Sequence, residues 1–113
     1  MLFRSNETGS RKVWRYKIGR DRMLSDKKLL IAFPDFGMDG MKADVKGNLY
    51  VTRHGKGTVA IVSPKGKLIR EVDVLGKMPT NITFGGPDGK TCYVTEVEHG
   101  RLVSFRVSER GRE

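Results

Sequence analysis

Asp39 and Asn81 are the two residues whose types and positions most directly suggest chemistry. Asp39 opens the stretch DGMKADVKGNLYVT, and Asn81 lies 42 positions later, at the entry to a similar apolar run. A carboxylate is a hard-oxygen ligand suited to Ca²⁺, and Asn81 could line the same pocket. Both residues also suit a simpler role, because Asp and Asn are common in turns. The residues by themselves leave the two roles open.

The histidines and the single cysteine are weaker candidates. His54 and His99 lie in similar polar loops next to glycine, but they are 45 positions apart and do not match the period of 43 described below. We expect both to be surface residues. Cys92 lies in the apolar run TCYV, where a thiol usually acts as a small buried hydrophobe. No Ser-His-Asp or Cys-His arrangement is indicated.

Short apolar runs typical of β-strands must position these residues. Met41, Ala43 and Val45 alternate with polar residues and predict a half-buried strand, which a KGN turn joins to a buried strand at 49–51. Further strands are predicted at 13–18, 28–33, 58–62, 67–74, 82–84, 91–95 and 101–107. Each run is bounded by Gly, Pro or Asp, so we predict an all-β chain. The expected core residues are Leu49, Val51, Val59, Ile61, Ile82, Phe84 and Val94.

The predicted strands repeat along the chain. The triplet YVT at 50–52 recurs at 93–95, and Gly57 recurs as Gly100, both after 43 positions. An earlier copy is offset by 46, with VWRY at 13–16 in the place of 59–62. A period of about 40 to 50 residues built from four short strands is typical of β-propeller blades.

The length of the chain allows only part of a propeller. At this period, 113 residues correspond to about two and a half blades, and a propeller needs at least about four. We predict a single partial propeller domain at 1–113, with a partial blade at 1–35, a complete blade at 36–75 and a partial blade at 76–113. The alternative is an open sheet or a small sandwich.

Several motifs together resemble the family of gluconolactonases, senescence marker protein and luciferin-regenerating enzyme, which are six-bladed propellers. The resemblance covers most of 13–107 and is specific as a set, although no single motif is. The motifs are VWRY at 13–16, DGM at 39–41, GNLYV at 47–51, PTN at 79–81, FGGPDG at 84–89 and YVT at 93–95.

The resemblance implies a metal-dependent hydrolase that acts on a small-molecule lactone or ester. It implies one divalent cation, Ca²⁺ or Zn²⁺, at the mouth of the central channel, with Asp39 as a metal ligand and candidate general base. The other ligands of the family would lie before residue 1. We therefore expect the C-terminal part of such an enzyme, inactive without the missing blades.

The charge of the chain suggests an alternative function. The net charge is +9, and the first 28 residues hold nine Lys and Arg against three acids. A basic balance suits anionic partners, so the alternative is a non-enzymatic binding protein that contacts one through its N-terminal third. No aromatic-basic RNA motif or zinc-knuckle spacing accompanies the charge, and we expect no specific nucleic-acid binding.

Location and self-association are further expectations. The longest apolar run, at 29–33, is far shorter than the roughly 20 residues that cross a bilayer. The first residues do not resemble a secretory signal. We expect no membrane contact and a cytoplasmic location, which a missing upstream segment would overturn. Unpaired sheet edges associate readily, so we expect self-association through exposed blade edges.

Overall fold

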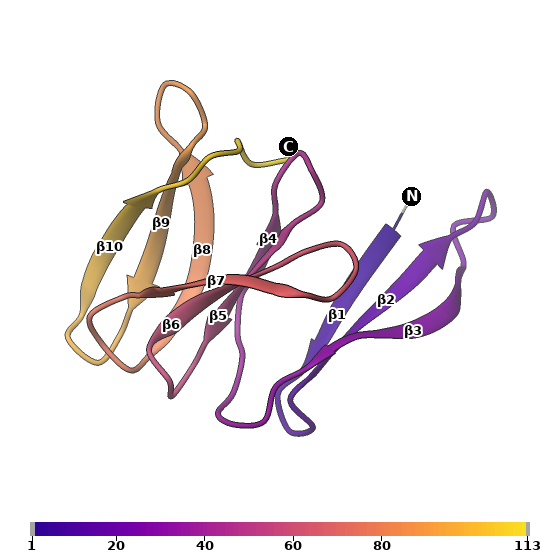
Figure 1. The fold of residues 1–113 in the computed structure, drawn as a ribbon, viewed down its shortest axis with the longest axis horizontal. Coiled ribbons are helices and arrows are strands. Elements are labelled where there is room, and N and C mark those ends of the chain that lie inside the picture. Colours follow the sequence, from indigo (N-terminus) through magenta and orange to yellow (C-terminus); the bar gives the residue numbers. More distant parts are fainter. Residues whose placement is uncertain (1, 113) are drawn as a thin grey trace.

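The computed structural model describes residues 2–112, and all regular secondary structure in that range is β-strand (Figure 1). The strands pair antiparallel in three sheets with the orders β1-β2-β3, β4-β5-β6-β7 and β8-β9-β10. We call them the N-terminal, middle and C-terminal sheets. Their strands are β1 (Leu2–Glu7), β2 (Lys12–Ile18), β3 (Leu24–Ala32), β4 (Met41–Ala43), β5 (Leu49–Arg53), β6 (Thr58–Val62), β7 (Leu68–Asp73), β8 (Pro79–Gly85), β9 (Thr91–Glu96) and β10 (Arg101–Arg106). The prediction of an all-β chain is confirmed.

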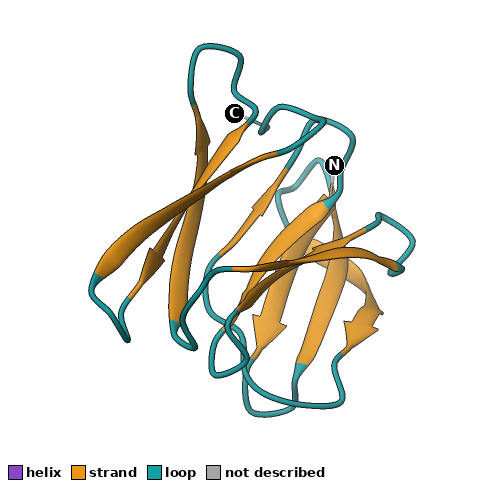
Figure 2. Cartoon of the chain, turned by 60° about the vertical axis from the view of Figure 1, so that its left-hand side comes forward, coloured by secondary structure: helices purple, strands orange, loops and turns teal. Residues whose placement is uncertain are grey.

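The three sheets follow one another in chain order, like neighbouring blades (Figure 1). Within each sheet every strand pairs with the strand that follows it in the sequence, so each sheet is a simple meander. Figure 2 shows the same arrangement from a second direction, with loops at both ends of the sheets. The connections at 33–40 and 74–78 lead from one sheet to the next.

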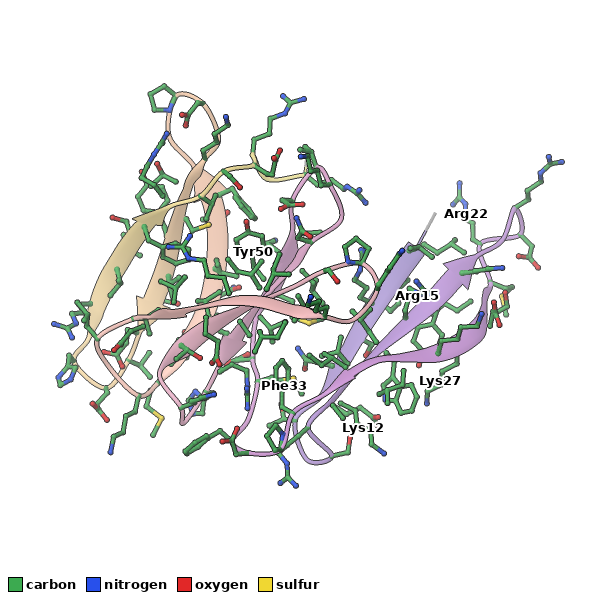
Figure 3. The ribbon with its side chains drawn as sticks, viewed as in Figure 1. Lys12, Arg15, Arg22, Lys27, Phe33 and Tyr50 are labelled. Atoms are coloured by element: carbon green, nitrogen blue, oxygen red, sulfur yellow. The ribbon has the colours of Figure 1, made fainter. Side chains whose placement is uncertain are left out.

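Two hydrophobic clusters lie on opposite faces of the middle sheet. Between the N-terminal and middle sheets the buried residues are Val13, Leu30, Phe33, Met38, Leu49, Val51, Ala60 and Val62. Between the middle and C-terminal sheets they are Tyr50, Val59, Ile61, Val74, Ile82, Cys92, Val94 and Val107. Figure 3 shows Tyr50 on the side that faces the C-terminal sheet. Of the expected core residues, only Phe84 is partly rather than fully buried.

Strand β5 contributes to both clusters because successive strand residues point to opposite faces. Leu49 and Val51 belong to the first cluster, and Tyr50 belongs to the second. All five residues of β5 are buried, which confirms the prediction for 49–51. Strand β7 forms the outer edge of the middle sheet and is mostly exposed.

Asp44 is buried, whereas the sequence pattern placed it on a polar face of its strand. Its Oδ1 accepts hydrogen bonds from the backbone N of Lys46 and of Asn48, both at 2.9 Å. Its Oδ2 accepts from Asn48 Nδ2 at 2.9 Å and from the Tyr50 hydroxyl at 3.4 Å. These four donors compensate the cost of burying a carboxylate. Asp44 therefore holds the turn, and the strand ends at Ala43 instead of continuing to Val45.

Two strand boundaries in the N-terminal sheet also differ from the prediction. Strand β1 continues through Asn6 and Glu7 and is not among the predicted strands, and β3 starts at Leu24 instead of 28. In both places a strand lies at the edge of its sheet. Polar side chains on an edge strand remain hydrated, so the apolar alternation that marks a strand is missing.

Two further expectations concern Cys92 and membrane-spanning segments. Cys92 is fully buried in the second cluster, as expected, and burial raises the pKa of its thiol to about 12. No helix within residues 2–112 has the length and apolar character needed to cross a membrane.

Candidate functional site

Asp39 lies in the connection that leads into β4, with its side chain exposed. Its backbone is held from two sides. The N of Asp39 donates to the carbonyl O of Thr52 at 3.1 Å, and its carbonyl O accepts from Asn6 Nδ2 at 2.8 Å. None of the ion pairs within residues 2–112 uses the Asp39 carboxylate. The side chain is thus presented to solvent from a fixed backbone.

Gly40 brings the Asp39 segment against the start of β8, where Asn81 lies. The N of Gly40 donates to the carbonyl O of Thr80 at 2.7 Å. A Cβ on Gly40 would lie 2.9 Å from both Asn81 Cα and Thr80 O, and closer still to Asn81 Oδ1. Only a residue without a side chain fits this approach. The structure therefore places Asn81, in β8, beside Gly40, which directly follows Asp39 in the connection before β4. We call β4 and β8, the first strands of the middle and C-terminal sheets, the inner strands.

Asn81 is exposed, but its side chain is already engaged locally. Its Oδ1 accepts a hydrogen bond from the N of Ile82 at 2.9 Å, and its own N donates to Thr95 Oγ1 at 3.1 Å. Thr95 Oγ1 in turn lies 2.7 Å from Thr80 Oγ1. These bonds fix the orientation of the Asn81 amide beside Gly40.

Asn6, Thr52 and Thr95 occupy corresponding positions in the three sheets and support the inner strands. Thr52 Oγ1 is 3.1 Å from Gly40 O and 3.2 Å from Thr80 O, and it can donate to either. Asn6 supports Asp39 and Thr95 supports Asn81 in the same way. These three residues are not among the candidates predicted from the sequence. The signal was present, because they are related by the same offsets of 46 and 43 as the rest of the repeat.

The described residues do not by themselves fit a divalent cation. Within 2–112 no group of three or more His, Cys, Asp or Glu side chains is arranged to hold a metal. The Asp39 end offers one carboxylate, and Asn81 Oδ1 is used by a backbone amide. Ca²⁺ takes about six to eight oxygen ligands, so most of them would have to come from outside this part of the chain.

The two histidines differ in their surroundings. His54 is half-buried, and its Nδ1 lies 3.3 Å from the carbonyl O of Pro79 at the start of β8. The expectation that His54 is a surface residue is therefore only partly met. His99 is exposed and pairs with Glu98 at 3.1 Å. Neither side chain is brought to the Asp39 carboxylate by a hydrogen bond within residues 2–112.

Comparison with known proteins decides the family. The SMP-30/Gluconolactonase/LRE-like region matches residues 1–98 of the chain. The chain belongs to this family. Its members include lactonases, which agrees with the resemblance carried by the short motifs around Asp39 and Asn81.

Curated relatives match nearly the whole chain but extend well beyond it. A diisopropyl-fluorophosphatase of Loligo vulgaris is 29% identical over 94% of the chain and 35% of its own length. A 6-deoxy-6-sulfogluconolactonase of Pseudomonas putida is 27% identical over 85% of the chain and 34% of its length. A pentonolactonase of Haloferax volcanii is 31% identical over 82% of the chain and 33% of its own length. The chain thus spans about a third of the length of these relatives.

Solved structures establish the fold. A luciferin-regenerating enzyme aligns with a TM-score of 0.87 and 20% identity, covering 98% of this chain and 43% of that one. Regucalcin of Agrobacterium tumefaciens, described as a calcium-binding protein, aligns with a TM-score of 0.85 and 24% identity over the same shares. The chain is therefore a fragment of a β-propeller, as predicted.

In this family fragment, a buried charge stabilises each loop that leads into an inner strand. Arg53, which is 1% exposed, donates from Nε to Gly37 O at 3.2 Å, bonds the carbonyl and carboxylate of Asp35 and stacks on Phe33 at 3.8 Å. Its counterpart 43 residues later, Glu96, is equally buried. Opposite charges thus occupy one repeat position.

Glu96 accepts hydrogen bonds from three backbone amides, those of Met78 at 3.2 Å, Glu98 at 2.8 Å and His99 at 3.0 Å. Burial by itself raises the pKa of the Glu96 carboxyl, but these amides favour the charged form and together lower the pKa below its ordinary value. Whereas Arg53 satisfies backbone carbonyls, Glu96 satisfies backbone N–H groups. Both solutions fix the chain where it enters β4 or β8.

Replacing Gly40 with alanine should destabilise the fold. The new Cβ would meet the backbone of Thr80 and Asn81 at 2.9 Å, so the two inner strands must separate, at a cost of about 1–3 kcal/mol. Urea unfolding followed by tryptophan fluorescence measures the loss. Gly9→Ala is the matched control, because nothing lies within 4 Å of a Cβ there. Equal stabilities of the two variants would contradict the close approach at Gly40.

Replacing Glu96 with glutamine should make stability less dependent on acid pH. Because the folded pKa of Glu96 lies below its ordinary value of 4.5, its stabilising effect is complete above that pH and is lost as pH falls through the folded pKa. The variant should be less stable at pH 7, and the difference from the wild type should shrink below about pH 4.

Thermal unfolding midpoints at pH 7, 5 and 3 provide the measurement, with Glu98→Gln as the control at an exposed glutamate next to the same loop. The prediction is wrong if the unfolding midpoints of Glu96→Gln and the wild type differ by the same amount at pH 7 and at pH 3. In that case the backbone amides do not stabilise the charged form of Glu96.

Proposed function

We propose that this chain is the C-terminal part of a lactone or ester hydrolase, with Asp39 as the principal functional side chain. The observation that carries the proposal is the exposed Asp39 carboxylate on a backbone held by Asn6, Thr52 and Gly40. Membership of a family that includes lactonases gives the reaction class. Asn81, fixed beside Gly40, is the proposed substrate-pocket residue.

The geometry supports this role because hydrolysis needs a carboxylate held in one place. A positioned side chain that accepts or delivers a proton in the transition state accelerates a reaction by about 10²–10⁴-fold. The backbone of Asp39 is fixed from both sides by hydrogen bonds to two sheets. Its side chain keeps both oxygens available for water, substrate or a cation.

Dependence on Ca²⁺ or Zn²⁺ is part of the proposal and rests on ligands that residues 2–112 do not supply. The calcium-binding description of regucalcin supports it for the family. The chain alone should bind either cation weakly. The division into a partial blade at 1–35, a complete blade at 36–75 and a partial blade at 76–113, and a cytoplasmic location, belong to the same proposal.

The chain by itself should not hydrolyse lactones, whereas a complete propeller that contains it should. The test is a chimera in which 2–112 replaces the matching third of the Pseudomonas putida 6-deoxy-6-sulfogluconolactonase. Chain and chimera are assayed on a panel of aldonolactones, with and without Ca²⁺ or Zn²⁺. In the chimera, Asp39→Asn should lower kcat/KM by about 10²–10⁴-fold.

Asp73→Asn in the same chimera is the matched control, because Asp73 is an exposed carboxylate on the outer strand β7. Its activity should equal that of the parent chimera. Hydrolysis by the isolated chain would contradict the need for further blades, and an active Asp39→Asn chimera would remove Asp39 from the site. Weak binding of an oligonucleotide that disappears at 200 mM salt would show only charge attraction.

A further inference from the structure

The positive charge of the loops is concentrated at the end of the sheets opposite Asp39. Loops alternate between two ends because each sheet is an antiparallel meander, and Figure 1 shows 44–48, 86–90 and the C-terminal segment together at the upper end. The loops at the Asp39 end hold three Lys and Arg and three acids, whereas those at the other end hold eight and four. We call the second end the basic end, and its segments are 19–23, 44–48, 63–67, 86–90 and 107–112.

Two arginines of the N-terminal sheet reach toward the basic end from neighbouring strands. Arg4 in β1 and Arg15 in β2 are register partners, so their side chains lie side by side on one face of the sheet. That face is turned to the middle sheet, because Arg4 Nη2 donates to the carbonyl O of Gly47 at 3.4 Å and Arg15 Nη1 donates to the carbonyl O of Pro64 at 3.5 Å. The pair therefore lies between two sheets that this chain itself supplies.

The two guanidinium groups have far more donors than acceptors around them. Each guanidinium carries five N–H groups, and the two long bonds to carbonyls are the only side-chain hydrogen bonds that Arg4 and Arg15 make within residues 2–112. Both side chains are half-buried, and Arg4 Nε is a buried polar atom without a hydrogen-bond partner among the described residues. A buried donor without an acceptor is costly, so this position calls for an acceptor from outside the described chain.

A third arginine, Arg112, adds positive charge to the pair. Burial lowers the pKa of the Arg4 guanidinium, and the charges of Arg112 and Arg15 lower it further. None of the ion pairs within residues 2–112 uses Arg4, Arg15 or Arg112. Like charges on directly opposed strand positions destabilise a sheet. The three arginines thus repel one another without a compensating carboxylate in this part of the chain.

The acids of the basic end are engaged elsewhere. Asp44 is buried and accepts from the amides of its own turn. Glu109 pairs with Lys46 at 3.0 Å, and Asp88 pairs with Arg106 at 2.6 Å. The negative partner that the three arginines lack is therefore not offered by these side chains.

A groove adjoins Arg112 and provides room for a ligand. Its volume is about 600 Å³, and it lies between β4, β8 and the C-terminal segment. Lys42, Arg110 and Arg112 line it together with the glycine-rich loop at 85–89. No ion pair within residues 2–112 uses Lys42 or Arg110. The groove therefore extends the positive charge of the three arginines into a concave surface.

We propose that Arg4, Arg15 and Arg112 bind a phosphate-type oxyanion at the basic end. The planar fork of a guanidinium matches the oxygens of phosphate and forms paired, charge-assisted hydrogen bonds with them. Such an anion supplies the acceptor that Arg4 Nε lacks and neutralises the opposed charges of Arg4 and Arg15. The oxyanion is either free phosphate or the phosphoryl group of a small molecule whose remainder occupies the groove.

The anion would connect the basic end to the strand that supports Asp39. Arg4 and Asn6 lie two residues apart on the same face of β1, and Asn6 donates to the carbonyl O of Asp39 at 2.8 Å. An anion held by Arg4 and Arg15 steadies β1 against the turns at Gly47 and Pro64. The inference concerns a second site and is measured by binding, so it does not depend on the proposed hydrolase activity.

The first experiment titrates the purified chain with inorganic phosphate and with glycerol 3-phosphate in a calorimeter, at an ionic strength held constant with NaCl. We expect one saturable site per chain. Tighter binding of the ester would identify a phosphorylated small molecule as the ligand, and equal or tighter binding of inorganic phosphate would identify the free ion. Constant ionic strength separates a specific site from general screening of the positive charge.

The second experiment compares Arg4→Met and Arg15→Met with Arg20→Met. Each of the first two should weaken phosphate binding by about tenfold or more, because a hydrogen bond to a charged group is lost. Arg20→Met is the matched control, since Arg20 is an exposed arginine in the loop at 19–23 of the same end. It should bind phosphate like the wild type.

Thermal unfolding in chloride separates a binding role from a structural one. Without phosphate, Arg4→Met and Arg15→Met should unfold at the same temperature as the wild type or higher, because each removes a like-charge contact. With phosphate, the midpoint of the wild type and of Arg20→Met should rise, since a ligand that binds only the folded state stabilises it. The midpoints of the other two variants should stay unchanged.

Three results would overturn the proposal. The first is a wild-type chain that binds neither phosphate nor glycerol 3-phosphate in a saturable manner. The second is an Arg4→Met variant that binds phosphate as well as the wild type, which would place the anion elsewhere. The third is a lower unfolding midpoint of Arg4→Met and Arg15→Met in chloride, which would assign both arginines to holding the turns at Gly47 and Pro64.

Discussion

The structure depends on the burial of the middle sheet between its two neighbours. Val51, Val59 and Val62 have no exposed surface, and fully burying such a side chain is worth about 1.5–3 kcal/mol. An ion pair between partly exposed groups, such as Lys56 with Glu71, is typically worth about 0–1 kcal/mol. Packing between sheets therefore decides the fold.

The site depends on that packing because its parts come from all three sheets. Asp39 precedes the middle sheet, Asn81 lies in the C-terminal sheet, and Asn6 reaches Asp39 from the N-terminal sheet. Gly40 and the buried Thr52 fix the distance between the first two through hydrogen bonds to Thr80. A change in the packing angle between sheets would move the Asp39 carboxylate relative to Asn81.

Arg53 and Glu96 show how a repeat preserves a structural task while its chemistry changes. Each occupies the last position of a buried second strand and satisfies the backbone of the loop before an inner strand. Arg53 donates to carbonyls, and Glu96 accepts from amides, because the two loops turn different backbone groups inward. A buried charge persists only when such partners satisfy it.

The sequence by itself determined the strand content, the period of 43 to 46, the family and Asp39 as the leading candidate. These follow from local alternation, turn residues and short motifs, which need no knowledge of distant contacts. Only the tertiary structure decided that Asp44 is buried, that β3 starts at Leu24, and that Asn6 and Thr52 hold the site. The physical reason is that burial of a polar residue, and strand formation at an exposed edge, depend on partners far away in the sequence.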